Sequence, residues 1–367
     1  GKVQTVTMKD APSKLTVSKK DMADLTKNLP GATFEVQDEN GDVVRTVYNE
    51  TLRWTTTEDA LVKTITGLKD GSYKLVETKA PTGYTIAAPI SFTVEKGKIY
   101  RSVDGEQAEI DTIAMEDQAT EVIISKTDIT TEKELPGATL QVLKKVTGED
   151  EAETEEVVTT IHGEKLEWKS TGEPKNIKGL PAGEYILRES AAPDGYTVAA
   201  DVTFTVTDEL KAVETVEMQD APIETVISKV DMADTAKELP GATLQILKKV
   251  TAEDGTTSEE IAVTVYGEKL QWISGEEAKE IKGLPAGDYI LREIAAPTGY
   301  TIAKDVEFTV SNDRKVTNKA VMEDQATEVK ISKVDITDAE KELPGATLQV
   351  MDKYGNEIVK TVYGEEL

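Results

Sequence analysis

A segment of about a hundred residues recurs along this chain and limits the folds that are open to it. Its marker is Ser-Lys-x-Asp followed, roughly ten residues later, by Leu-Pro-Gly. The lysines of the four copies are Lys19, Lys126, Lys229 and Lys333. Because a unit of this length can hold one small core, we expect each complete copy to be one domain.

The repeat divides the chain into five expected segments. Residues 13–119, 120–222 and 223–326 are three complete repeats, and residues 327–367 are the start of a further, truncated repeat. Residues 1–12 contain Val-Thr-Met-Lys-Asp, which resembles the Val-Glu-Met-Gln-Asp that closes a complete repeat. They are expected to be the last strand of a preceding, truncated repeat, so both ends look cut from a longer chain.

Short runs of alternating apolar and polar residues fill each repeat. Residues 138–142 and 202–206 alternate cleanly, and no stretch shows a helical period. Residues 39–42, Glu-Asn-Gly-Asp, are typical of a hairpin turn. Acidic residues crowd into 144–157 and 248–261, where we expect exposed hairpin loops. About six to eight short strands per repeat predict an all-β fold of tandem Ig-like β-sandwiches.

Composition excludes several classes of function. The net charge of −27 argues against nucleic acid and anionic membrane surfaces as partners. Because the chain has no cysteine, disulfides, thiol nucleophiles and zinc–cysteine sites are excluded. No apolar run reaches the roughly 20 residues of a membrane span. The acidic clusters lack the spacing of a calcium loop, so we expect no metal and no cofactor.

Ionisable residues recur on strand faces that are otherwise apolar. Lys126 shares a face with Ile124 in the first strand of its repeat, and Asp220 shares one with Met218 in the last. The motif Tyr-x-Leu-x-Glu places a glutamate beside tyrosine and leucine in the same way. Its three copies end in Glu77, Glu189 and Glu293. Each complete repeat is therefore expected to point a lysine, a glutamate and an aspartate into its core.

Charges buried in this way are costly, because the interior does not replace the water that they lose. Burial lowers the pKa of an amine and raises the pKa of a carboxyl group, so a neutral amine would face a protonated acid. With a glutamate to move protons, the amine can attack the aspartate carboxyl group and release water. The uncharged amide that results predicts a covalent bond within each complete repeat.

Together these residues resemble the Cna-B type domains, also called SpaA-like or prealbumin-like, of Gram-positive surface adhesins and pilins. In that family a first-strand lysine and a last-strand aspartate or asparagine form an autocatalytic isopeptide bond, assisted by a catalytic glutamate of a central strand. The resemblance implies three such sites at matching positions. They are Lys19, Glu77 and Asp117; Lys126, Glu189 and Asp220; and Lys229, Glu293 and Asp324.

Three positions depart from this pattern. Lys333 has neither its glutamate nor its aspartate in this sequence, and Asp10 has neither its lysine nor its glutamate, so both are expected to stay unbonded. The segment between Glu77 and Asp117 is longer than in the other repeats, which leaves the bond of the first repeat open.

Several other features have structural interpretations. Leu-Pro-Gly-Ala-Thr and Ala-Pro-x-Gly-Tyr are expected to be turns, the first rather than a sortase signal because it recurs in each repeat. His162, the single histidine, is expected in a loop or strand rather than as a ligand. One tryptophan recurs per repeat and is expected in the core: Trp54, Trp168 and Trp272.

The resemblance implies a structural stalk that presents a distal domain at the surface of a bacterium, anchored to the cell wall through a missing C-terminal region. Adhesin repeats that bind host matrix protein directly, or a pilin shaft, are the alternatives. Short linkers between repeats predict a stiff rod. We expect a monomeric, extracellular chain whose partners are its neighbouring repeats and possible host matrix protein, and no enzyme beyond single-turnover bond formation.

Overall fold

In the computed structural model the described part of the chain comprises residue 4 and residues 11–103, 105–147, 153–252 and 254–367. These residues form strands joined by turns and contain no α-helix, so the all-β prediction is confirmed. The described residues fall into two compact units. The first holds the first repeat and most of the second. The other holds the third repeat, residues 327–367 and the segments Asp128–Thr131 and Ala192–Val198.

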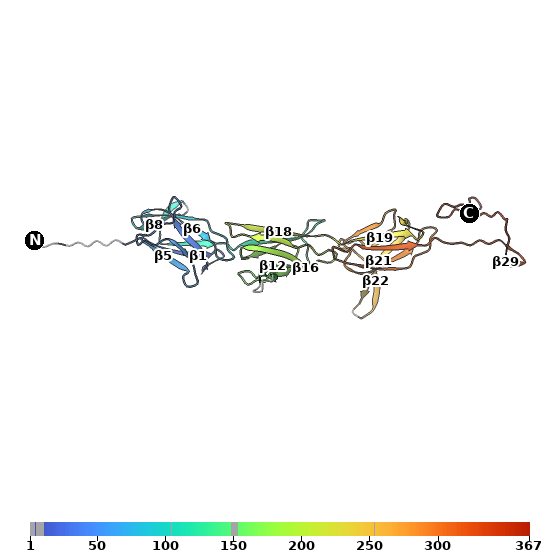
Figure 1. The fold of residues 1–367 in the computed structure, drawn as a ribbon, viewed down its shortest axis with the longest axis horizontal. Coiled ribbons are helices and arrows are strands. Elements are labelled where there is room, and N and C mark those ends of the chain that lie inside the picture. The colour runs from blue at the N-terminus through green and yellow to red at the C-terminus, as the bar shows by residue number, and fades with distance from the viewer. Residues whose placement is uncertain (1–3, 5–10, 104, 148–152, 253) are drawn as a thin grey trace. The chain divides into compact units, whose positions relative to one another are not determined.

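In the first repeat, one sheet is organised around β1 (Lys14–Asp21) (Figure 1). This strand runs parallel to β10 (Thr112–Asp117) and antiparallel to β2 (Asp24–Asn28) and β5 (Val62–Thr66). Alternate residues of β1 are buried, which is the pattern expected for one face against a core. The first and last long strands of the repeat are therefore hydrogen-bonded neighbours.

The second sheet of this repeat faces the first across a core of aliphatic and aromatic side chains. Its strands, in spatial order, are β4 (Arg53–Thr55), β3 (Thr33–Gln37), β6 (Gly71–Lys79), β7 (Ile90–Glu95), β8 (Lys98–Val103) and β9 (Glu106–Ile110). The central strand β6 bears Glu77. Between Gln37 and Val43 the chain turns back on itself at Gly41, whose φ is 85°, so the predicted hairpin is confirmed.

The hairpin of β8 and β9 accounts for the longer segment between Glu77 and Asp117 in the first repeat. Within the described residues this repeat has ten strands and the third has nine, so the expected six to eight was too low for both. A second reason is the short strand that follows the lysine strand in the first and third repeats, such as β2. Four of the five residues of β2 are polar and the first four are exposed, so no alternation marks it in the sequence.

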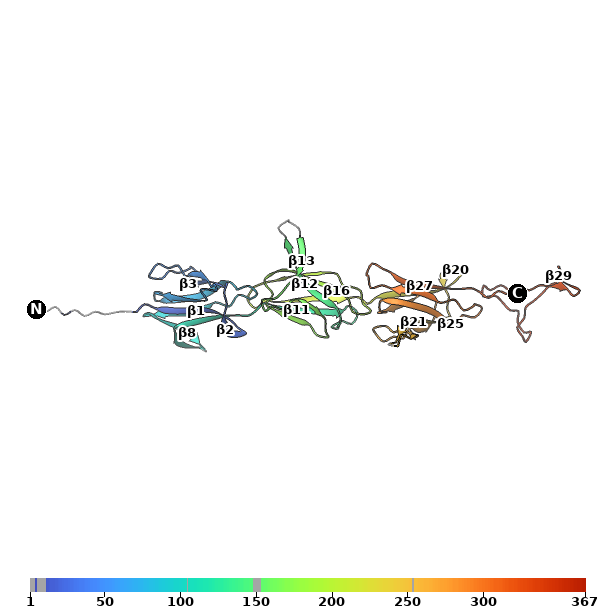
Figure 2. The same ribbon diagram turned by 90° about the horizontal axis from the view of Figure 1, so that it is seen from below.

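The second repeat follows the same plan. The lysine strand β11 (Glu121–Asp128) lies between β15 (Lys175–Lys178) and β18 (Val213–Asp220). The facing sheet contains β13 (Glu153–Val157), β12 (Thr139–Thr147), β14 (Glu167–Lys169), β16 (Gly183–Ala191) and β17 (Val202–Val206). Figure 2 shows β13 standing out from this repeat, and its residues are mostly exposed, as expected for the acidic hairpin.

In the third repeat the lysine strand β19 (Glu224–Asp231) pairs in parallel with the last strand, β27 (Asn318–Asp324). Its other partners are β20 (Asp234–Glu238) and β24 (Lys279–Lys282). The facing sheet contains β22 (Thr257–Ile261), β21 (Thr243–Thr251), β23 (Gln271–Ile273), β25 (Gly287–Ala295) and β26 (Val306–Val310). Residues 327–367 contain one short hairpin, β28 (Val334–Asp335) with β29 (Asp338–Glu342).

The turn and core interpretations of the sequence are confirmed. After β11, the Ser170 hydroxyl donates to the Leu135 carbonyl oxygen at 2.7 Å and accepts from the Ala138 N–H at 2.9 Å, which holds the Leu-Pro-Gly-Ala turn. Each tryptophan is half-buried against the core of its own repeat: Trp54, Trp168 and Trp272.

Because Ile99 of β8 is only 2% exposed and belongs to the core, the extra hairpin is part of the fold rather than an appendage. We expect Ile99→Ala to destabilise the first repeat by about 2 to 5 kcal/mol through the cavity that it leaves. Hydrogen exchange of the strands of the first repeat measures this loss. Ser102→Ala on the exposed face of the same strand is the control, and equal exchange in both variants would contradict the assignment.

Candidate functional site

The lysine, glutamate and aspartate of the first repeat come from three strands and two sheets. Lys19 lies on β1 and Asp117 on the adjacent, parallel β10, where Lys19 is opposite Met115 and Asp117 is opposite Asp21. The two side chains are thus diagonal neighbours on the inward face of one sheet. Glu77 projects from β6 of the facing sheet, so the trio lies between the two layers.

In the first repeat the three side chains are in contact. Lys19 Nζ lies 2.7 Å from Glu77 Oε2 and is also paired with Asp117 Oδ1. The side chains of all three are fully buried. The ammonium nitrogen also lies 5.6 Å from the centre of the Phe34 ring, which closes the core around it.

The third repeat repeats this arrangement. Lys229 Nζ lies 3.1 Å from Glu293 Oε1 and is paired with Asp324 Oδ1. Lys229 is opposite Met322 in the parallel pair of β19 and β27, the same register as in the first repeat. The sequence-based grouping of these residues therefore corresponds to a shared location in both repeats.

In the second repeat Lys126 Nζ lies 3.1 Å from Glu189 Oε1. Asp220 is fully buried and ends β18, the strand adjacent to β11. All nine side chains that the sequence singled out in the complete repeats are thus buried.

The electrostatics of the site favour neutral aspartates. Burial raises the pKa of Asp117 to about 8; the charge of Lys19 opposes this shift and that of Glu77 adds to it. Burial likewise raises the pKa of Asp324, against the influence of Lys229 and with that of Glu293. At neutral pH a protonated aspartate, which can lose its hydroxyl group, is therefore accessible beside the amine.

Sequence reasoning missed what orients the glutamates. In each complete repeat one glutamate oxygen accepts a backbone N–H ten residues further along the chain. The donors are Ala87 for Glu77 at 2.8 Å, Ala199 for Glu189 at 2.6 Å and Ala303 for Glu293 at 2.7 Å. The constant separation and the Ala-Pro-x-Gly-Tyr turn between the two partners were available signals, but backbone donors are not specified by residue type.

Some polar atoms of the site are poorly satisfied. Glu77 Oε1, Asp117 Oδ2 and Asp324 Oδ2 are buried and have no hydrogen-bond partner among the described residues. An unpaired buried acceptor costs free energy that folding must supply from elsewhere. A site of this kind can react, since an amine held against a carboxyl group needs no further approach and loses charge when it forms an amide.

A second set of aspartates, which the sequence analysis did not select, lies two residues after each lysine. In the first repeat the Tyr84 hydroxyl donates to Asp21 Oδ2 at 2.9 Å. In the other unit Tyr196 donates to Asp128 Oδ2 at 3.0 Å, and Tyr300 donates to Asp231 Oδ2 at 2.8 Å. The tyrosine that ends each Ala-Pro-x-Gly-Tyr turn thus holds the end of the lysine strand as well as the turn. The recurrence of this tyrosine in every complete repeat was the sequence signal that could have revealed the contact.

The remaining sequence-selected residues lie elsewhere. Lys333 is exposed, and Asp10 is outside the described residues. His162 is exposed in a turn after a strand-like segment. In the described ranges, no group of three or more His, Cys, Asp or Glu side chains is arranged to hold a metal ion. None of the described residues belongs to a helix long and apolar enough to cross a membrane.

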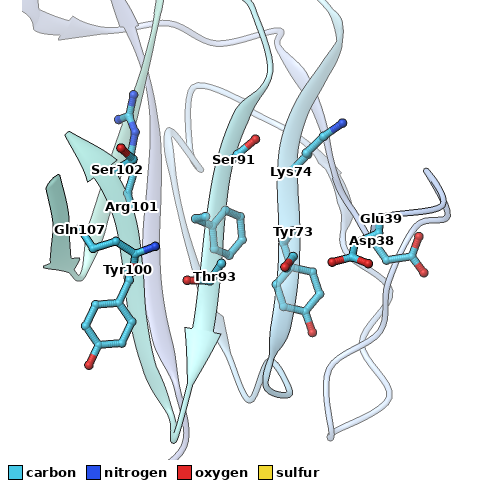
Figure 3. A pocket seen from close by; sticks show the side chains of 12 residues that line it. Asp38, Glu39, Tyr73, Lys74, Ser91, Thr93, Tyr100, Arg101, Ser102 and Gln107 are labelled. Carbon is cyan, nitrogen blue, oxygen red and sulfur yellow. The ribbon is translucent and has the colours of Figure 1, made fainter. Parts of the chain in front are cut away.

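A shallow hollow of about 270 Å³ is lined by residues of β6, β7 and β8 in the larger sheet of the first repeat (Figure 3). Tyr73 and Tyr100 come from separate strands of its floor, Lys74 and Arg101 add positive charge, and Asp38 lies on the loop at one edge. Its side chains carry both signs of charge and belong to a strand face rather than an enclosed cavity.

The chain is a series of β-sandwiches, each with a buried lysine, glutamate and aspartate. Comparison with known proteins identifies the family of these domains. The sequence matches the model of the SpaA family, a prealbumin-like fold domain, over residues 13–108, 120–222 and 224–326. These segments make up more than half of the chain. The chain therefore belongs to the SpaA prealbumin-like family, and the resemblance drawn from the motifs is confirmed.

Similar solved structures include the Bacillus anthracis TIE protein, the major pilin BcpA of Bacillus cereus and the full-length major pilin SpaD of Corynebacterium diphtheriae. Their sequence identities to this chain are 22%, 16% and 15%, with TM-scores of 0.42, 0.35 and 0.37. The matches cover 86%, 86% and 87% of this chain, and 51%, 100% and 98% of those chains. Comparison with curated proteins finds no match.

Because the pKa of Asp117 is raised, an unbonded first repeat should lose stability as the pH rises. Lys19→Met removes the amine and with it the influence that lowers this pKa. Between about pH 4 and pH 8 the folded state then holds a proton that the unfolded state releases, so the free energy of unfolding falls by up to roughly 1.4 kcal/mol per pH unit. Thermal unfolding from pH 4 to pH 9 measures the slope. Lys20→Met is the control, and equal slopes would contradict the assignment.

Proposed function

We propose that this chain is part of the structural stalk of a bacterial cell-wall-anchored surface protein, stiffened by autocatalytic Lys–Asp isopeptide bonds. The observation that carries the proposal is the buried contact of Lys19 with both Glu77 and Asp117, and its counterpart at Lys229. Membership of the SpaA family supports the same reading. In this proposal the cross-linked pairs are Lys19–Asp117, Lys126–Asp220 and Lys229–Asp324, and the glutamates assist the reaction.

The proposed step is a condensation that balances without any co-reactant. Neutral lysine Nζ attacks Cγ of the protonated aspartate, and one C–N bond forms. The glutamate takes a proton from the nitrogen and returns one to the departing hydroxyl group, so that a C–O bond breaks and one water leaves. The backbone N–H of Ala87, Ala199 or Ala303 would hold the glutamate in position during the transfer.

Such a bond would change how tension passes through a repeat. In the parallel pair of β1 and β10, force enters at the start of the first strand and leaves at the end of the last. An amide between Lys19 and Asp117 would carry that force directly, and the residues between them would be bypassed. By analogy with disulfides, closing a loop of about a hundred residues adds roughly 4 to 5 kcal/mol in the chain-entropy model.

The remaining parts of the proposal concern the whole protein. We take residues 13–119, 120–222 and 223–326 as the cross-linked repeats, with residues 1–12 and 327–367 as parts of neighbouring repeats. The parent protein would be extracellular, anchored to the cell wall and monomeric, and would present a distal domain. Lys333 and Asp10 would stay unbonded in this sequence because their partners lie outside it.

A direct adhesive role is the second candidate, and the hollow between Tyr73 and Tyr100 is the feature that favours it (Figure 3). Binding of a host matrix protein at this hollow would depend on residues of the first repeat alone. A solid-phase screen against matrix proteins separates the two functions, with Tyr100→Ala as the variant that should abolish any signal from this surface. A shaft of polymerised pilins is the other alternative.

The intact mass of the chain tests the cross-links directly. We expect the measured mass to be lower than the sequence mass by three waters, one for each complete repeat. A mass equal to that of the sequence would eliminate the proposed bonds. A loss of more than three waters would show that Lys333 or Asp10 reacts as well, contrary to the assignment of both as unbonded.

Substitution of the glutamate tests its part in the reaction. We expect Glu189→Gln to restore the mass of one water and to lower the melting temperature of the second repeat, because proton transfer is lost while the shape of the side chain is kept. The matched control is Glu184→Gln on the exposed face of the same strand, β16, which should keep all three bonds. Full loss of water in Glu189→Gln would show that this glutamate is dispensable.

A further inference from the structure

The linker between successive repeats is held on both sides by backbone hydrogen bonds. In the first unit Thr120 N–H donates to the Gly83 carbonyl oxygen at 3.0 Å, and the Thr120 carbonyl oxygen accepts from Gly179 N–H at 2.9 Å. Gly83 belongs to the first repeat and Gly179 to the second. The Thr120 hydroxyl adds a bond of 2.6 Å to the Leu180 carbonyl oxygen. One linker residue is thus fixed to a turn of each repeat.

The same bridge recurs in the other unit. Ile223 N–H donates to the Gly195 carbonyl oxygen at 2.8 Å, and the Ile223 carbonyl oxygen accepts from Gly283 N–H at 2.8 Å. Thr327 N–H donates to the Gly299 carbonyl oxygen at 2.8 Å in the next linker. A linker residue whose N–H and carbonyl oxygen are both hydrogen-bonded cannot act as a free hinge.

An aliphatic side chain of each following repeat packs on the glycine of the Ala-Pro-x-Gly-Tyr turn. A Cβ atom on Gly83 would lie 2.7 Å from Ile161 Cγ2, and one on Gly195 would lie 2.5 Å from Val265 Cγ1. Val362 takes the same place over Gly299. These glycines therefore serve a close approach in addition to their positive φ.

The residue after this aliphatic side chain reaches the second set of aspartates. Tyr266, from the third repeat, donates to Asp128 Oδ2 at 3.2 Å, beside the bond from Tyr196. Tyr363 donates to Asp231 Oδ1 at 3.3 Å, beside the bond from Tyr300. Each aspartate thus accepts one tyrosine hydroxyl group from its own repeat and one from the residues that follow.

We infer that these residues form a built joint, in which the end of one repeat is a docking surface for the next repeat of the chain. The socket consists of the glycine and tyrosine of the Ala-Pro-x-Gly-Tyr turn and the aspartate that follows the lysine. The plug is the Val-Tyr pair of the next repeat, at Val265–Tyr266 and again at 362–363. At the first junction the pair is Ile161 and His162, so the aliphatic half is kept and the tyrosine is replaced.

The socket aspartate is charged, as a shared acceptor needs to be. Burial acts to raise the pKa of Asp128, but hydrogen bonds from the Thr130 N–H and from the hydroxyls of Tyr196, Thr131 and Tyr266 outweigh it, and the pKa lies below its usual value. Asp128 also ends the strand that carries Lys126. The joint and the proposed cross-link therefore share one strand end. Its mechanical use rests on the proposed stalk function, whereas the docking itself does not.

A matched plug on the first repeat provides the control. Val47 N–H donates to the Gly67 carbonyl oxygen at 2.8 Å, as Val265 N–H donates to that of Gly283 at 2.9 Å. Val47 and Tyr48 are 55% and 66% exposed, whereas Val265 and Tyr266 are 40% and 43% exposed. Val47 and Tyr48 are therefore the same pair of residue types, and within the described part of the chain no socket residue contacts them.

The test uses the complete chain, whose lack of cysteine allows two spin labels to be placed by substitution. Labels at Thr205→Cys and Glu280→Cys, on exposed strand positions of the second and third repeats, report the distribution of distances between them. We expect Val265→Ala with Tyr266→Phe to broaden this distribution. The control, Val47→Ala with Tyr48→Phe, should leave it unchanged.

An unchanged distribution in the Val265 and Tyr266 variant would overturn the joint. Tyr266→Phe alone is the milder form, should broaden the distribution less, and remains informative if the double variant lowers the melting temperature of the third repeat. Intact mass, measured on the same samples, reports the cross-links separately. An unchanged distribution with three waters missing from the mass shows that the joint proposal has failed. A broadened distribution with no water missing shows that the cross-link proposal has failed.

Discussion

The contact between a buried lysine, aspartate and glutamate is the interaction on which the rest of this structure depends. It lies where the two sheets of a repeat face each other, and its members come from the first strand, the last strand and a central strand. Fully buried side chains with unsatisfied oxygens are expensive as ions. The proposed amide within each repeat would remove this cost, because it carries no charge.

The second set of polar contacts makes each repeat part of a series. The lysine strand carries the buried lysine and, two residues later, the socket aspartate, as at Lys229 and Asp231. Tension carried by the proposed amide would thus pass directly into the bonded linker and the plug of the next repeat. Short linkers prevent large separations, but hydrogen bonds on both sides of Thr120 and Ile223 are what restrict rotation.

Much of the site followed from residue type and register. Lys126 and Glu189 fall on apolar faces because strand side chains alternate, and the repeat allowed one pattern to be tested three times. What escaped were interactions with donors that every residue has, such as the Ala199 N–H to Glu189, and a hydroxyl bond from Tyr196 that a turn motif does not announce. The β8–β9 hairpin escaped too, since its outer strand is polar and exposed on most positions.

The sequence by itself determined the repeat, the all-β class, the inward faces and the identity of the three ionisable residues, because each of these depends on local order along one strand. Only the tertiary structure decided that the first and last strands are parallel neighbours, that the glutamate comes from the opposite sheet, and that Tyr266 meets Asp128. These relations join residues far apart in the chain, and the spacing of residues along a sequence does not fix which strands pair in space.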